Sequence, residues 1–157
     1  MNEFFDEKST LDDVILLLSQ EKEPIRFLVA EDDETNKFYL ETLLNKMNIK
    51  VMTATNGQEA FEIFSKESFD CVFMDIQMPV MDGITSSVMM RQYEEKVRVK
   101  KTTIVVLTAL ENNIDMIELN EAGINDYISK PVSAYELCYW VKDWYEKRKE
   151  NLNIPSV

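Results

Sequence analysis

Short apolar runs alternate with longer amphipathic stretches along most of this chain. Several runs, such as Cys71 to Met74 and Ile104 to Leu107, are continuously apolar and stop abruptly at a polar residue. Runs of this kind are typical of strands that are buried on both faces of a parallel sheet. The pattern predicts strands at residues 25–30, 49–54, 70–74 and 103–107, and a less apolar one at 125–128.

The stretches between these runs carry apolar residues at helical spacing. In residues 34–47, Phe38, Leu40, Leu44 and Met47 recur in this way. Helices are predicted at residues 9–22, 34–47, 57–66, 83–95, 112–121 and 133–148. Strands that alternate with helices predict an α/β fold, a parallel sheet with helices on both faces and right-handed crossovers.

Polar side chains of distinct chemistry follow four of the predicted strands. They are Glu31 and Asp32 after the first strand, Asp75 after the third, Thr108 with Ala109 after the fourth, and Lys130 with Pro131 after the last. The carboxyl ends of parallel strands meet at one edge of the sheet, where α/β folds place their binding sites. Neighbouring carboxylates repel one another, and a hard cation such as Mg²⁺ relieves that repulsion. The pattern therefore predicts one site built from four segments.

Charge and composition narrow the range of functions. The chain has 157 residues, which suits one domain, and its 17 Lys and Arg against 29 Asp and Glu give a net charge of −12. This balance disfavours direct binding to nucleic acid, which needs a basic surface. The basic segment 96–101 is interpreted as a solvated connector. Because the sequence contains no histidine, it excludes a histidine kinase, a histidine phosphotransfer domain and a Ser-His-Asp or Cys-His catalytic arrangement.

The cysteines and the lengths of the apolar runs indicate where in the cell the protein is located. Cys71 and Cys138 lie in apolar surroundings far apart in the sequence, which favours buried free thiols in a reducing compartment over a disulfide. The sequence has no run of 18 apolar residues and no signal segment. We therefore expect a soluble, cytoplasmic protein without direct membrane contact.

Five motifs together resemble one known family. They are AEDDETN (30–36), MDIQMPVMDG (74–83), LTA (107–109), EAG (121–123) and NDYISKP (125–131). In this order and spacing they resemble the receiver domain of two-component response regulators, and most closely the receivers of hybrid histidine kinases. The resemblance implies a doubly wound, flavodoxin-like fold with strand order 2-1-3-4-5. It divides the chain into an N-terminal extension or linker helix (1–24), a receiver domain (25–148) and a C-terminal tail (149–157).

The resemblance also implies roles for the residues at the strand ends. Asp75 would accept a phosphoryl group, and Lys130, before a cis Pro131, would pair with a phosphoryl oxygen. Mg²⁺ or Mn²⁺ would be the cofactor. Its ligands would be Glu31 through water, Asp32, Asp75 and the backbone carbonyl of Gln77. Asp33 stands where hybrid-kinase receivers usually have Asn, and its expected role is to cap the helix 34–47.

The resemblance also implies a conformational switch and a rate at which the phosphoryl group is lost. Thr108 would move toward the phosphoryl group, for which Ala109 leaves room, and Tyr127 would turn inward behind it. A buried strand tyrosine without a switching role is the alternative for Tyr127. Gln77 and Leu110 would flank the path of attacking water. Since Leu110 cannot orient a water molecule, we expect slow self-dephosphorylation.

The leading function is therefore a phosphoacceptor in a phosphorelay, not an enzyme acting on a separate substrate. The expected partner is a histidine kinase or histidine phosphotransfer protein. Surplus aromatic residues on helix 133–148 indicate a homodimer or effector surface, unless helix 9–22 covers that patch. A receiver that docks partners without phosphorylation remains an alternative. An aspartate-nucleophile phosphohydrolase is disfavoured because Gln77 stands where such enzymes carry their general acid.

Overall fold

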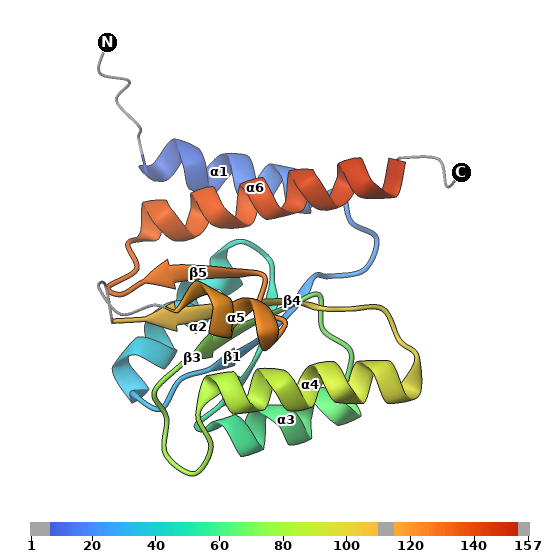
Figure 1. Cartoon of the computed structure of the whole chain (residues 1–157). Helices are drawn as coiled ribbons and strands as arrows, with labels where there is room; N and C mark the ends of the chain where they lie inside the picture. The colour runs from blue at the N-terminus through green and yellow to red at the C-terminus, as the bar shows by residue number, and fades with distance from the viewer. Residues whose placement is uncertain (1–6, 110–114, 154–157) are drawn as a thin grey trace.

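Strands and helices alternate along the chain, as the sequence pattern predicts. The computed structural model describes residues 7–109 and 115–153 (Figure 1). The strands are β1 (Arg26–Ala30), β2 (Lys50–Ala54), β3 (Cys71–Asp75), β4 (Thr103–Thr108) and β5 (Asp126–Ser129). The helices are α1 (Glu7–Leu18), α2 (Glu34–Lys46), α3 (Gly57–Lys66), α4 (Gly83–Val97), α5 (Met116–Glu121) and α6 (Ala134–Asn153).

The strands form one parallel sheet in the order β2-β1-β3-β4-β5. This confirms the predicted fold class and strand order. Successive residues of a strand point to opposite faces, so each central strand feeds two cores. Phe27 and Val29 pack with α1, α2 and α6 on one face, whereas Leu28 and Ala30 pack with α3, α4 and α5 on the other. Figure 1 shows α1 and α6 on one side of the sheet and α3 and α4 on the other.

Several predicted boundaries need correction. Helix α1 ends at Leu18, before residue 22, and α4 and α6 continue beyond residues 95 and 148. The start of the predicted helix 112–121 lies outside the described residues. Strand β5, the less apolar strand of the prediction, is an edge strand whose Asp126, Tyr127 and Ser129 are exposed.

Helix α1 packs side by side with α6 on one face of the sheet (Figure 1). Val14 and Leu18 of α1 are buried in the same apolar cluster as Cys138 and Tyr145 of α6. The Tyr145 hydroxyl also donates a hydrogen bond of 2.6 Å to Glu21, just after α1. Part of the aromatic surplus of α6 is therefore covered within the chain.

The rest of that surplus stays at the surface. Tyr139 is 59% exposed, and Tyr135 stacks on it with ring centroids 6.4 Å apart. The predicted partner surface on α6 is therefore limited to Tyr135, Tyr139 and the residues around them.

Replacing Val14 with aspartate should lower the free energy of unfolding by about 3 kcal/mol, because Val14 is 0% exposed and a carboxylate there would lose its water. Leu16 lies on the same helix but is 68% exposed, so Leu16→Asp is a matched control expected to change it by less than about 0.5 kcal/mol. Urea denaturation followed by tryptophan fluorescence measures both. Equal effects would show that α1 does not depend on its buried face.

Candidate functional site

The functional residues predicted from the sequence meet at the carboxyl edge of the sheet. Asp75 is the last residue of β3 and Thr108 the last of β4. Glu31 follows β1 directly, and Lys130 follows β5. Because β1, β3, β4 and β5 are neighbours in register, their ends bring these side chains to one place.

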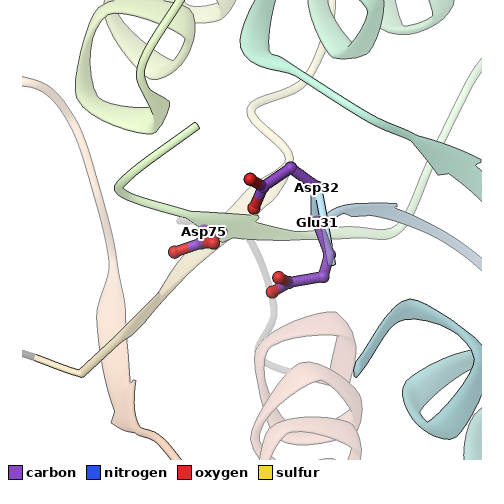
Figure 2. A group of neighbouring side chains, drawn as sticks. All are labelled: Glu31, Asp32 and Asp75. Carbon is purple, nitrogen blue, oxygen red and sulfur yellow. The ribbon is translucent and has the colours of Figure 1, made fainter. Parts of the chain in front are cut away.

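Three carboxylates form the acidic part of the site. One oxygen each from Glu31, Asp32 and Asp75 lies within 4.8 Å of the others. Figure 2 shows the three carboxylates around a common space beyond the ends of β1 and β3. Glu31 and Asp75 are buried, whereas Asp32 is exposed. Buried and exposed oxygen ligands side by side suit a hard divalent cation that keeps part of its water shell.

Lys130 is the basic part of the site. Its Nζ lies 2.6 Å from Oε2 of Glu31 and 3.1 Å from Oδ2 of Asp75. The backbone N–H of Lys130 donates to the carbonyl of Thr108 at 2.8 Å, and the Lys130-Pro131 peptide is cis, as predicted. The backbone hydrogen bond holds the main chain of Lys130 in place, and its ammonium group lies between two carboxylates.

Burial and pairing act against each other in this cluster. Burial raises the pKa of Glu31, and the hydrogen bond from Lys130 only partly offsets that rise. Burial alone would lower the pKa of Lys130, but its bonds to Glu31 and Asp75 outweigh burial and raise it. Lys130 therefore stays a cation near neutral pH, which is the state that can neutralise a phosphoryl oxygen.

The loop after β3 holds Asp75 from the other side. The backbone N–H of Gln77 donates to Oδ1 of Asp75 at 3.3 Å. A Cβ on Gly83 would lie 2.1 Å from the carbonyl oxygen of Asp75, so only glycine lets α4 begin so close to the end of β3. Asp82 caps α4 by accepting from the N–H of Thr85 at 2.8 Å.

Val80 in the same loop has a φ of 71°, a left-handed conformation that is unfavourable for a β-branched residue. Its side chain is 83% exposed, so little packing depends on it. Val80→Gly should therefore raise the free energy of unfolding by about 0.5 kcal/mol, since relief of the left-handed strain exceeds the entropy cost of glycine. Val99→Gly, at a position that is 54% exposed without positive φ, should lower it. Thermal denaturation of both variants shows whether each substitution raises or lowers the stability of the fold.

The remaining predicted residues fall around this centre. Thr108 is buried at the end of β4, and Ala109 beside it is exposed. Tyr127 on β5 is 39% exposed and so is not a buried tyrosine, and its role in switching stays a prediction. Leu110 lies outside the described residues. Asp33 caps α2 by accepting from the N–H of Asn36 at 2.8 Å, as predicted.

Sequence reasoning missed a cavity beside the site. Its volume is about 480 Å³, and Glu31, Lys130, Tyr39 and Val132 are among its lining residues. Phe38, which was assigned to the apolar helical pattern of α2, is not one of these lining residues and is 71% exposed. It lies about 200° around the helix from the buried Leu40 and therefore faces away from the core.

Comparison with known proteins identifies the family. The model of the response regulator receiver domain matches residues 27–142. The chain is 37% identical over 119 residues to the sensor histidine kinase GacS of Pseudomonas protegens, covering 76% of this chain and 13% of that protein. It is 32% identical over 115 residues to the transcriptional regulatory protein SrrA of Staphylococcus aureus, covering 73% of this chain and 45% of that one. The chain spans less than half the length of these relatives.

Solved structures agree with this result. The receiver domain of Saccharomyces cerevisiae Ssk1, in complex with the histidine phosphotransfer protein Ypd1, matches with a TM-score of 0.74 and 31% identity over 80% of this chain and 91% of that one. The receiver of sensor kinase PA1611 from Pseudomonas aeruginosa, with magnesium in its active-site cleft, matches with a TM-score of 0.69 and 28% identity over 79% and 99%.

The chain therefore belongs to the receiver domains of two-component signalling, whose members include receivers within hybrid sensor kinases. No described helix is both long enough and apolar enough to cross a membrane.

Proposed function

We propose that this chain accepts a phosphoryl group on Asp75 from a phosphohistidine and passes the change to a partner surface. The observation that carries the proposal is the position of the Asp75 carboxylate. It lies buried at the strand edge, within 3.1 Å of the ammonium of Lys130 and beside two further carboxylates. Since the sequence contains no histidine, the donor is another molecule or another part of a longer protein. The complex of the Ssk1 receiver with Ypd1 supports a histidine phosphotransfer protein or kinase as that donor.

In the transfer step, a carboxylate oxygen of Asp75 attacks the phosphorus atom. A P–O bond forms, the P–N bond of the donor breaks, and the imidazole leaves with the bonding electrons and takes up a proton. The product is an acyl phosphate. Lys130 neutralises charge on a phosphoryl oxygen, and Asp75 is held in place by the N–H of Gln77.

A divalent cation, Mg²⁺ or Mn²⁺, completes the site in this proposal. Glu31, Asp32, Asp75 and the backbone carbonyl of Gln77 would hold it, and the three clustered carboxylates fit such an ion. When bound, it offsets the negative charge of the carboxylates and of the incoming phosphoryl group.

Thr108 and Tyr127 would carry the signal outward. Thr108 is buried beside the acceptor strand, whereas Tyr127 is half-exposed on the adjacent edge strand. Attraction of the Thr108 hydroxyl by the phosphoryl group would leave space beneath Tyr127. Ala109 leaves room for the phosphoryl group. Gln77 and Leu110 would flank the path of attacking water, and because an apolar Leu110 cannot orient a water molecule, the phosphorylated state would be lost slowly.

The test is intact-mass spectrometry after incubation with Mg²⁺ and a small-molecule phosphodonor, with a chelator in a parallel sample. One phosphoryl adduct that requires the cation is the expected result. If no adduct forms although calorimetry shows that Mg²⁺ binds, the chain is instead a docking receiver that works without phosphorylation.

A further inference from the structure

A hollow lies at the surface between the edge strand β5 and the helix α6, which are neighbours in Figure 1. Its volume is about 560 Å³, and because β5 is the last strand in the order of the described sheet, the outer edge of β5 is left open. None of the basic residues whose side chains the structure describes lines this hollow, which is called the aromatic hollow below. Its lining includes four aromatic and two acidic residues: Tyr127, Tyr135, Tyr139, Trp140, Asp126 and Glu136.

The carboxylates of the aromatic hollow are not balanced by cations. Asp126 and Glu136 are exposed and make no ion pair with any residue that the structure describes. Asp126 instead accepts a hydrogen bond of 2.9 Å from the indole N–H of Trp140. On the same helix, Lys147 is already paired with Asp143 at 2.8 Å and does not line the hollow. The hollow therefore has a local negative potential that attracts a cationic group.

The aromatic rings of the hollow are accessible and held in place. Tyr139 and Tyr127 are 59% and 39% exposed. Tyr135 stacks on Tyr139 with ring centroids 6.4 Å apart, and Trp140 packs edge-on against the buried Phe73 at 5.2 Å. Because these contacts order the rings before a ligand arrives, little conformational entropy is lost when the hollow is occupied.

We propose that the aromatic hollow binds an arginine side chain presented by a segment of a partner protein. A guanidinium group is planar, so its face can stack on a tyrosine ring while the N–H groups at its edge donate to Asp126 or Glu136. A hard metal ion would use the carboxylates but not the rings, since it takes oxygen ligands. Nucleic acid and anionic bilayers would be repelled by the same carboxylates.

The test uses the full chain, unphosphorylated and without Mg²⁺, so its result does not depend on phosphoryl transfer to Asp75. The NMR signal of the Trp140 indole N–H reports on the hollow, because this group donates to Asp126. Peptides of glycine and serine are titrated that differ only at their central residue, which is arginine, its neutral isostere citrulline, or leucine. The arginine peptide should shift the signal saturably, bind at least about fivefold more tightly than the other two, and bind more weakly as salt is added.

Matched variants separate the charges and the rings of the hollow from a general effect of charge. Asp126→Asn with Glu136→Gln keeps the shapes and the acceptor for Trp140, and it should weaken binding of the arginine peptide at least about fivefold. Glu23→Gln with Glu95→Gln makes the same change in net charge at exposed positions outside the hollow and should leave affinity within about twofold. Tyr139→Ser should weaken binding about threefold, whereas Tyr139→Phe should preserve it, because the ring face carries the interaction.

Several outcomes would overturn the proposal. The first is an arginine peptide that leaves the Trp140 signal unchanged, or that binds no more tightly than the citrulline or leucine peptide. The second is an equal loss of affinity in both double variants, which would mean that the peptide responds only to the overall charge of the chain. The third is a Trp140 signal that shifts with protein concentration and not with peptide, which would mean that a second copy of this chain occupies the hollow.

Discussion

Replacing Asp75 with asparagine should abolish the phosphoryl adduct completely. An amide oxygen is a far weaker nucleophile than a carboxylate oxygen, and none of the neighbouring groups can take its place. Glu31 is held by Lys130 at 2.6 Å, and Asp32 stands outside the buried position that Asp75 occupies at the end of β3. The measurement is intact mass after incubation with Mg²⁺ and a small phosphodonor.

Asp82→Asn is the matched control for this variant. Asp82 lies in the same loop and caps α4, and asparagine caps a helix about as well as aspartate. This variant should accept the phosphoryl group like the unaltered chain. An adduct that persists in Asp75→Asn, and disappears only when Glu31 or Asp32 is changed, would move the acceptor to another carboxylate and contradict the proposed function.

The parts of the structure that could be predicted depend on short-range pattern. Apolar runs such as Cys71 to Met74 have to be buried on both faces, so they identify strands, and the residues that end them lie at one edge of a parallel sheet. Asp75 and Lys130 are therefore brought together by topology alone, although they are far apart in the sequence. Helix caps such as Asp33 and Asp82 are also local, and both were predictable.

The burial of individual side chains could not be predicted in the same way, because it depends on how helices and strands pack against one another. Phe38 was counted in the helical apolar pattern, but it lies about 200° around α2 from the buried Leu40, and only the packed structure shows which of the two faces meets the core. Tyr127 resembles a core residue until β5 is known to be an edge strand. In the same way, only the packing of α1 on α6 shows that Tyr145 is covered while Tyr139 is exposed.

Lys130→Met should separate metal binding from phosphoryl transfer. Loss of the ammonium that contacts Asp75 at 3.1 Å should slow formation of the adduct by about a hundredfold, since a preorganised charge facing the phosphoryl oxygens is lost. Affinity for Mg²⁺ should rise, because the same ammonium also occupies Glu31 at 2.6 Å and competes with the cation for both carboxylates. Calorimetric titration and intact-mass kinetics measure the two effects.

Stability supplies an independent readout of the same variant. Without Lys130, the carboxylate of Glu31, which is 1% exposed, is left without its cationic partner, and breaking a buried pair in this way costs about 3 kcal/mol. Mg²⁺ can restore the missing positive charge, so it should raise the melting temperature of Lys130→Met more than that of the unaltered chain. Lys37→Met, which removes an ion pair to the exposed Glu34 on α2, should show neither effect. If Mg²⁺ instead bound Lys130→Met more weakly, Lys130 would be supporting the cation site rather than competing with it, and the competition argued here would be wrong.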